Sequence, residues 1–475
     1  FGYKHRMKER RMEIRERQAA FMRELNDELW KLGILSKTQH NEVAPAQHEM
    51  APIYSTANIA TDHNQLVMET MKKVARRHNF ECLLHEKPFA GVNGSGKHDN
   101  WSLVTNTGKN LLSPGKTPYD NKQFLLFLSA VIAAVDDNAA LLRMSASNPG
   151  NDHRLGANEA PPAIISIFLG EQLEDIVEQI LQNGTATHSN KGERMDIGVH
   201  TIPPIKKDAT DRNRTSPFAF TGNKFEFRMV ASSMSIAGAN TVLNATVADV
   251  LQSMADRMEK ADDLDKTVDE IIYETLKEHQ KVIFNGNGYS DEWIAEAEKR
   301  GLPNVKTMVD ATASLLYPKT IEMFERQHVY TKTELESRAE INYEAYAKAI
   351  NIEAKTMIHM ASKEYIPAII SYVTSLGDSI NSISAACAEA DLSVQKDLLT
   401  TCSSLLAKAQ TALYALKDAD KKANAMEEGK EQAEFFRDTV FTAMADLRAP
   451  IDELEMIVDK EYWPVPSYGD MLFEV

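Results

Sequence analysis

The chain has 475 residues, of which 43% are hydrophobic, and a formal net charge of -16. This length is enough for two or three domains with cores of their own, and the negative charge argues against non-specific nucleic-acid binding. No apolar run approaches the ~20 residues of a membrane span, and the three cysteines form no Cys-x-x-Cys pair that would indicate a zinc ribbon. We therefore expect a cytoplasmic protein with neither a nucleic-acid nor a membrane partner.

The N-terminal segment, residues 4–34, predicts a helix whose apolar positions begin at Phe21. Its first half alternates basic and acidic residues, which is typical of a solvated helix face, although the basic residues could also contact an anionic partner. The chain begins with Phe1 and not with Met, so we expect a fragment or a processed product.

Residues 35–232 are expected to form strands joined by functional loops, because Gly, Pro and Asn cluster there between short apolar runs. Alternation of apolar and polar residues over 225–230 predicts a half-buried strand, and the apolar run 163–169 predicts another. Helical spacing predicts helices over 55–78 and 122–144. Antiparallel strands with helices to one side make an α+β domain.

From about residue 233 onward the pattern is helical almost throughout. We expect a short helix over 291–300 and long amphipathic helices over 333–375, 376–415 and 420–458. The long helices are typical of a bundle or hairpin that serves packing or assembly, and the apolar tail 463–475 is expected to dock. We divide the chain into a helical segment (1–34), an α+β domain (35–310) and a helical region with the tail (311–475).

A glycine-rich loop over residues 91–102 is similar to a phosphate-binding P-loop up to Lys97, but the next residue is His98. A P-loop needs Ser or Thr at that position to hold Mg²⁺, whereas an imidazole is itself a metal ligand. The following residues, 101–104, also predict a strand where a P-loop continues into a helix. We therefore reject a P-loop NTPase. His98 by itself does not establish a metal site, because a lone His is more often a structural residue than a ligand.

Two carboxylates, Glu42 and Glu49, flank Pro45. Their odd spacing puts them on opposite faces of an extended segment unless the chain turns between them, and Pro45 favours such a turn. Carboxylates that converge across a bend suit a hard cation such as Mg²⁺ or Mn²⁺. An isolated pair of this kind is more often a solvated surface feature.

Further charged residues lie in Gly- and Asn-rich surroundings. On the strand over 225–230, Glu226 and Arg228 share one face, which either is exposed to solvent or lines a charged cavity. Glu159 lies in a loop where a carboxylate can act as a base or a cation site. Fixed positive charges suited to carboxylate or phosphate groups are Arg154, Arg212, Arg214 and Arg228.

In chain order these segments resemble the catalytic domain of glutamine synthetases. The shared motifs are Glu42-x-x-x-x-Gln47-x-Glu49, Asn93-Gly-Ser-Gly-x-His98, Arg154-Leu-x-x-x-x-Glu159-Ala-Pro, Asn213-Arg214 and Glu226-x-Arg228. Within this family, the chain resembles the large type III branch. The similarity lies in the sequences of residues 41–49 and 97–100, the helical C-terminus and the Trp-Pro-x-Pro-Ser-Tyr-Gly-Asp tail. The resemblance covers essentially the whole chain and implies a glutamine-synthetase-type α+β domain followed by a long helical region.

The resemblance implies that ATP phosphorylates the γ-carboxylate of glutamate and that ammonia then displaces phosphate. It implies two or more Mg²⁺ or Mn²⁺ ions, with Glu42 and Glu49 on one ion and His98 and Glu226 on the other. Two cations would neutralise the nucleotide oxygens and the transferring phosphoryl group.

For the substrates, the resemblance implies that Asn93 and Gly94 hold the backbone groups of glutamate and that Arg154 clamps its carboxylate, with Arg228 beside it. Glu159 would bind ammonium, help to deprotonate it and close the site as a flap against water. The positions expected to face the nucleotide and its phosphoryl group are Ser102, Lys224 and Arg214.

The chain also departs from the family pattern. Asn100 stands where many members have a second His. The family commonly has an Arg in an Ile-Arg-Ile-Pro segment after Asn-Arg, and residues 216–220 offer no replacement for it. Val230-Ala231 replaces the Pro-Asp that usually follows Glu-x-Arg. We find no strand with a Glu-x-Glu pair before Glu42, so we expect this polypeptide alone to lack one ligand at each metal site and to be weakly active or inactive.

Family members form rings, so the resemblance also implies a homo-oligomer, a dodecamer of two hexameric rings. The alternative is a non-catalytic protein of the same fold, whose helical C-terminus drives assembly.

Overall fold

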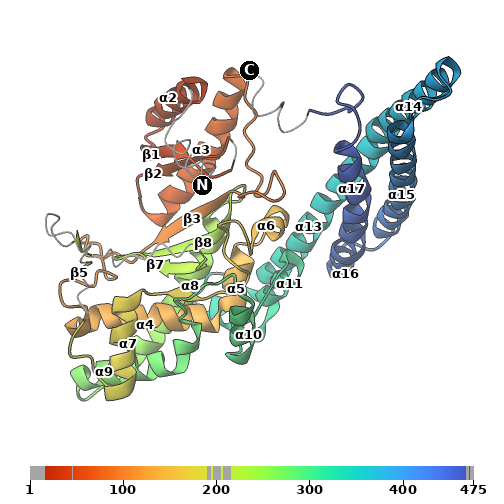
Figure 1. Ribbon diagram of the computed structural model, residues 1–475. Coiled ribbons are helices and arrows are strands. Elements are labelled where there is room, and N and C mark those ends of the chain that lie inside the picture. The colour runs from red at the N-terminus through yellow and green to blue at the C-terminus, as the bar shows by residue number, and fades with distance from the viewer. Residues whose placement is uncertain are drawn as a thin grey trace. The chain divides into compact units, whose positions relative to one another are not determined.

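The computed structural model describes residues 16–44, 46–189, 194–195, 205–206, 215–466 and 470. The chain divides into two compact units, Phe1–Glu336 and Ser337–Val475, and each is described by itself (Figure 1). The domain limits drawn from the sequence stay predictions.

The first unit begins with a small module of two helices and a hairpin. Helix α2 (Glu16–Lys31) packs on α3 (Ala57–Arg77). The chain between these helices forms strands β1 (Ser36–Asn41) and β2 (His48–Pro52), which pair antiparallel. The shared core consists of Leu25, Leu29, Ile34, Val67 and Val74. The helix expected over 55–78 is confirmed, and the described part of the N-terminal helix agrees with its prediction.

A four-stranded sheet forms the centre of the first unit, in the order β3-β8-β7-β4. Its strands are β3 (Gly96–Trp101), β4 (Ile167–Phe168), β7 (Phe218–Phe220) and β8 (Phe225–Ala231). The β3–β8 and β7–β8 pairs are antiparallel as expected, whereas β4 pairs with β7 in parallel. A short antiparallel pair, β5 (Arg194–Met195) and β6 (Ile205–Lys206), lies apart from this sheet.

Helices gather on one side of this sheet (Figure 1). Phe124 of α4 (Lys122–Asp137) packs on Phe220, with ring centroids 5.9 Å apart. The indole of Trp101 donates to Asn244 of α8 (Ala237–Glu259) at 2.9 Å. The expected α+β class is therefore confirmed.

The strand over 225–230 was expected to be half buried, and this prediction is wrong. Arg228 faces away from the helices, yet only 7% of it is exposed. Strand β8 is therefore buried on both faces, with Glu226 alone partly exposed, which the alternating pattern does not reveal. Of the two interpretations of the Glu226–Arg228 face, the structure therefore favours a charged, covered site.

The expected helix over 122–144 is broken at Asn138 into α4 and α5 (Ala139–Ser145), which meet at 82°. Among the described residues no single helix is long and apolar enough to cross a membrane, and this bent pair meets the length and composition criteria only when its two helices are joined. The remaining helices of the first unit are α6 (Pro149–Arg154), α7 (Glu171–Asn183), α9 (Leu264–His279), α10 (Asp291–Lys299), α11 (Met308–Thr312) and α12 (Pro318–Arg326).

The second unit is a helical bundle in which the strongest packing joins α15 to α17 and α14 to α15. Its helices are α13 (Lys332–Met360), α14 (Ile366–Ala386), α15 (Ser393–Ala423), α16 (Lys430–Phe435) and α17 (Phe441–Glu455). The first turn of α13 precedes Ser337, where the unit begins. The break expected at 375/376 is wrong, because α13 continues into α14 through a π-helical turn at Ala361–Tyr365 and the chain reverses only after Ala386. Trp463 of the tail packs on Tyr365 at 5.1 Å, in agreement with the expected docking.

Candidate active site

The hairpin of β1 and β2 brings the two predicted carboxylates together. Glu42 follows β1 directly, and its N–H donates to the carbonyl of Gln47 at 2.8 Å, which closes the turn. Glu49 lies on β2 opposite His40. The turn that the sequence required between Glu42 and Glu49 is present, although Pro45 itself lies outside the described residues.

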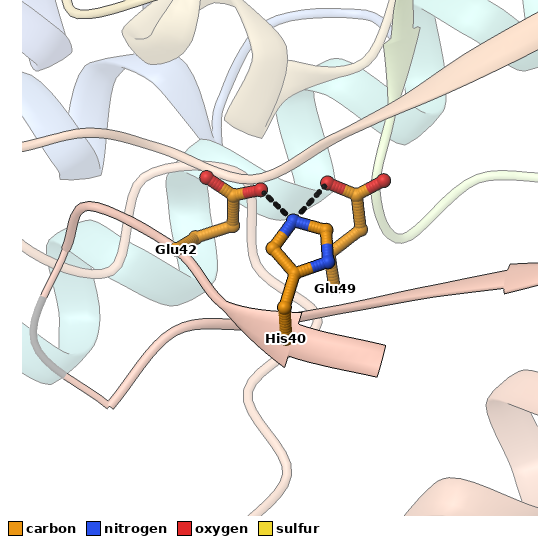
Figure 2. Close-up of side chains that lie close together, drawn as sticks. All are labelled: His40, Glu42 and Glu49. Carbon is orange, nitrogen blue, oxygen red and sulfur yellow. Dashed lines mark hydrogen bonds and ion pairs between the residues drawn. The ribbon is translucent and has the colours of Figure 1, made fainter. Parts of the chain in front are cut away.

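His40 lies between the two carboxylates, as Figure 2 shows. Its Nε2 is 2.9 Å from Glu42 Oε1 and 3.4 Å from Glu49 Oε2. Burial, together with the hydrogen bond and the charge of Glu42, raises the pKa of Glu49. Two carboxylates that oppose each other's ionisation beside an imidazole are a donor set that fits a divalent cation, and all three ligand atoms lie within 4.8 Å of one another.

The sequence analysis missed His40. A signal was available, because residues two apart on a strand share a face, and His40 and Glu42 have that spacing at the end of β1. Only the strand register showed that Glu49 joins them from the opposite strand.

A second acid–histidine pair lies on the outer face of the central sheet. His98 Nδ1 is 3.0 Å from Glu226 Oε1, and Arg228 donates to the other carboxylate oxygen of Glu226 at 2.8 and 2.9 Å. Burial alone would raise the pKa of Glu226, but His98 and Arg228 lower it to about 2. The predicted ligands His98 and Glu226 therefore lie in contact, with Glu226 held as an anion.

The two acid–histidine groups are joined through the loop before β3. The side-chain amide of Gln47, in the hairpin, donates to the carbonyl of Gly94 at 2.8 Å and to the hydroxyl of Ser95 at 3.0 Å. The charge of His98 also lowers the pKa of Glu49, against the larger effect of burial. The hairpin and the outer face of the sheet thus belong to one electrostatic site.

Two further predicted residues meet at the edge of this loop. Asn93 donates from its side chain to Glu159 Oε2 at 2.8 Å. Glu159 belongs to a flap, residues 156–161, that follows α6, and its backbone is left-handed at φ 69°. The expected substrate residue and the expected base on the flap are therefore in contact.

Arg154 is almost completely buried, with 4% of its surface exposed. Its guanidinium donates to the Asn151 side chain at 3.0 Å and to the Arg228 carbonyl at 3.2 Å. It lies under Gly96, where a Cβ atom would be only 2.0 Å from Nη2. In this arrangement Arg154 supports β8, and the expected clamp on a glutamate carboxylate stays a prediction.

The charges around the loop are mostly positive. Lys87, Lys97 and Arg154 stand against one buried carboxylate, Glu86, which is 1% exposed. Lys97 Nζ donates to backbone carbonyls at the end of β8, including Met234 at 2.6 Å, and burial lowers its pKa to about 8. Lys97 is thus engaged in the fold. The strand expected over 101–104 instead covers Gly96–Trp101, so the glycine-rich loop still runs into a strand and not into the helix of a P-loop.

The residues expected to face a nucleotide lie at the far end of β3. The hydroxyl of Ser102 donates to the carbonyl of Asn223 at 3.2 Å, and Asn223 precedes Lys224 in the turn between β7 and β8. Ser102 and Lys224 therefore lie at the same end of the sheet. Arg212 and Arg214 lie outside the described residues.

A second cluster of possible metal ligands, Asp136, Asp137 and His279, lies away from this site at the ends of α4 and α9. His279 Nδ1 is 2.8 Å from Asp136 Oδ2, and Lys281 Nζ is 3.4 Å from the same oxygen. His279 and Lys281 already balance the charge of the carboxylates, so the cluster acts as a link between α4 and α9.

Comparison with known families identifies two matching regions. Residues 2–164 match the family described as "Glutamine synthetase, catalytic domain", and residues 267–384 match "Glutamine synthetase C-terminal domain". The first region contains the hairpin, the glycine-rich loop and the flap residue Glu159, and the second contains Tyr289, whose hydroxyl donates to the carbonyl of Ala160 in the flap at 2.8 Å.

Similar proteins extend over nearly the whole chain. A "Glutamine synthetase" from Butyrivibrio fibrisolvens is 46% identical over 97% of this chain, and a "Type-3 glutamine synthetase" from Dictyostelium discoideum is 44% identical over 95%. A "Glutamine synthetase" from Bacteroides fragilis is 42% identical over 97%. The chain spans 66%, 62% and 64% of the lengths of these relatives, respectively.

Proposed function

The chain belongs to the glutamine synthetase family, and from this premise we propose that it forms glutamine from glutamate, ammonia and ATP. The observation that supports this most directly is the convergence of two acid–histidine groups across one loop. His40, Glu42 and Glu49 lie on the hairpin, His98 and Glu226 lie on the sheet, and the Gln47 amide ties the hairpin to Gly94.

The two acid–histidine groups are the proposed metal ligands. Glu42, Glu49 and His40 would hold one Mg²⁺ or Mn²⁺ ion, and His98 with Glu226 would contribute to a second. When bound, such ions supply positive charge to the ATP phosphates and to the transferring phosphoryl group. Arg228 keeps Glu226 ionised and oriented, because it donates to the carboxylate oxygen that His98 does not contact.

The loop around Gly94 is the proposed site of glutamate. Three cations, Lys87, Lys97 and Arg154, against the two carboxylates of Glu86 and Glu159 leave it positively charged, which favours an anionic amino acid. Gly94 leaves no room for a side chain, since a Cβ atom there would be 2.4 Å from the Glu86 carbonyl. Asn93 would bind the backbone groups of glutamate, and the buried charge of Arg154 under Gly96 would draw its carboxylate.

Glu159 is the proposed base. Its carboxylate, held by Asn93 at 2.8 Å, would accept a proton from ammonium, so that neutral ammonia attacks the acyl carbon of γ-glutamyl phosphate and phosphate leaves. The flap that carries Glu159 would exclude water, which otherwise attacks the same carbon. Ser102 and Lys224 would contact the nucleotide, and Arg214 is proposed for the phosphoryl group from the family pattern alone.

The proposal is tested in the natural protein by the substitution Glu49→Gln. We expect wild type to form glutamine only when glutamate, ammonium, ATP and Mg²⁺ or Mn²⁺ are all present. Calorimetric titration with Mn²⁺ should show a specific site that Glu49→Gln weakens by about 100-fold or more, since altering residues that merely orient metal ligands already costs about 10- to 100-fold.

The matched control is Glu69→Gln, which removes an exposed carboxylate on α3 in the same module. It should leave both Mn²⁺ binding and glutamine formation unchanged. If wild type binds no Mn²⁺ specifically and forms no glutamine, the catalytic proposal fails, and a non-catalytic assembly protein of the same fold becomes the better explanation.

A further inference from the structure

The flap that carries Glu159 has an unfavourable backbone. Asn158 and Glu159 are two consecutive residues other than glycine with left-handed φ angles, 53° and 69°. Such conformations cost free energy and persist only where surrounding contacts hold them. Within the flap, the hydrogen bond from Gly156 N–H to the Pro161 carbonyl, at 2.9 Å, closes the loop at its base.

Tyr289 supplies a contact to the flap from outside. Its hydroxyl donates to the carbonyl of Ala160, the residue next to Glu159, at 2.8 Å. Ala160 is only 2% exposed, so the acceptor of this partly buried hydrogen bond is shielded from water. Burial, together with the charge of Glu159, raises the pKa of Tyr289 to about 12, and the hydroxyl therefore stays a donor at any working pH.

The loop that carries Tyr289, residues 283–290, is itself firmly anchored. The N–H of Phe284 donates to the Ile167 carbonyl at 2.8 Å, and the Asn285 side chain accepts from the N–H of Leu169 at 2.9 Å. The Phe284 ring stacks on Trp293 with centroids 3.7 Å apart. Tyr289 thus reaches the flap from a base that is tied to β4 and α10.

The same loop also passes close to Thr215 and to Pro162, the residue that follows the flap. Gly288 N–H donates to the hydroxyl of Thr215 at 2.9 Å. A Cβ atom at Gly288 would be 2.9 Å from the Thr215 carbonyl and 3.3 Å from Pro162. Only a glycine lets the backbone approach closely enough for the adjacent Tyr289 to meet Ala160.

We propose that Tyr289 is a positioning residue that latches the flap closed and so holds Glu159 against Asn93 in the glutamine synthetase reaction. The inference rests on the proposed function for its chemistry. With the flap closed, ammonia attacks the acyl carbon of γ-glutamyl phosphate and glutamine forms. With the flap open, water attacks that carbon, the bond to phosphate breaks, and glutamate and phosphate are released without glutamine.

The test is Tyr289→Phe in the natural protein, with Tyr317→Phe as the control. Tyr317 is a similarly exposed tyrosine, 42% against 36%, and it is the N-cap residue of α12. Two quantities are measured: amide hydrogen exchange of residues 157–160, and phosphate released per glutamine formed. The first reports opening of the flap, whose Ala160 N–H donates to the Ala157 carbonyl at 3.1 Å, and the second would not respond to a general loss of stability.

Loss of one hydrogen bond should raise the open population about two- to tenfold. We expect exchange of residues 157–160 to accelerate by that factor in Tyr289→Phe, the phosphate-to-glutamine ratio to rise above one, and Tyr317→Phe to match wild type. Unchanged exchange or an unchanged ratio overturns the inference. If wild type forms no glutamine, the proposed function fails by itself, and the exchange measurement still decides whether Tyr289 holds the flap.

Discussion

At the scale of single residues, buried charged side chains hold the strand on which the candidate ligand Glu226 lies. Glu86 accepts from the N–H and the hydroxyl of Ser233 at 2.9 and 2.6 Å, and its charge offsets those of Arg154 and Lys97. Both cations donate to backbone carbonyls of β8 or of the residues just after it. The strand that presents Glu226 is therefore held by buried charged groups through its backbone carbonyls.

Gly96→Ala tests this buried support. The new Cβ would meet the Arg154 guanidinium at 2.0 Å, and that group is held by β8 and cannot withdraw. We expect a loss of about 1–3 kcal/mol in the free energy of unfolding, which is the usual cost of overpacking a core, measured by urea denaturation.

The same substitution at Gly377 serves as the control. Gly377 lies within α14, and a Cβ atom there would meet nothing within 4 Å beyond the backbone of its own helix. Gly377→Ala should therefore stabilise the protein by about 0.5–1 kcal/mol through helix propensity. Equal stability of Gly96→Ala and wild type would contradict the buried position of Arg154.

At the scale of elements, helices α4 and α9 are linked at their C-terminal ends by the buried pair of Asp136 and His279. Burial alone would lower the pKa of His279, but the hydrogen bond to Asp136 and the charges of Asp137 and Glu278 raise it above its usual value. Lys281 also contacts Asp136, at 3.4 Å. A cation near the last turn of a helix also interacts favourably with the helix dipole.

This link makes the stability of the protein depend on pH. Because the folded pKa of His279 is raised, the pair contributes in full below the unfolded pKa of about 6.5 and loses its contribution as pH rises through the folded value. The advantage of wild type over His279→Gln in unfolding free energy should therefore be larger at about pH 5.5 than at about pH 9.

Urea denaturation at the two pH values measures this difference. His63→Gln, on the partly exposed surface of α3, is the control and should follow wild type at both. A difference between wild type and His279→Gln that grows with pH would show that the sign of the effect is wrong.

At the scale of the whole molecule, the residues proposed for chemistry that the structure describes all lie in the first unit, and the second unit has a core of its own. Helix α15 alone buries Leu405, Leu413 and Leu416. Since α15 packs most strongly on α17 and α14 of the same compact unit, the second unit is a candidate for independent folding.

We expect a fragment of residues 332–475, which begins at the start of α13, to be helical and to unfold cooperatively, as followed by far-UV circular dichroism. Leu416→Ala should destabilise it by about 2–5 kcal/mol, because Leu416 is 0% exposed, whereas Tyr414→Ala, at a residue 64% exposed, should have little effect. A gradual melt without a transition would mean that the second unit folds only as part of the longer chain.

The sequence by itself determined the family motifs, the α+β class and the residues proposed as metal ligands, except His40. Glu42, Glu49, His98 and Glu226 were selected as candidate ligands through the resemblance of their motifs, in chain order, to the family, whereas the class depends on periodicity. The strand at 225–230 and the helix at 55–78 were predictable for the same reason.

Only the tertiary structure decided which of these residues meet and what surrounds them. His40 joins Glu49 through strand register, Arg154 meets Gly96 through a sheet and a helix that are distant in sequence, and Tyr289 reaches the flap across 129 residues. The sequence also misplaced the reversal before α15, which it put at 375/376, because α14 continues unbroken from the π-helical turn at Ala361–Tyr365 to Ala386. Such contacts arise from packing between distant segments, and local patterns carry no record of them.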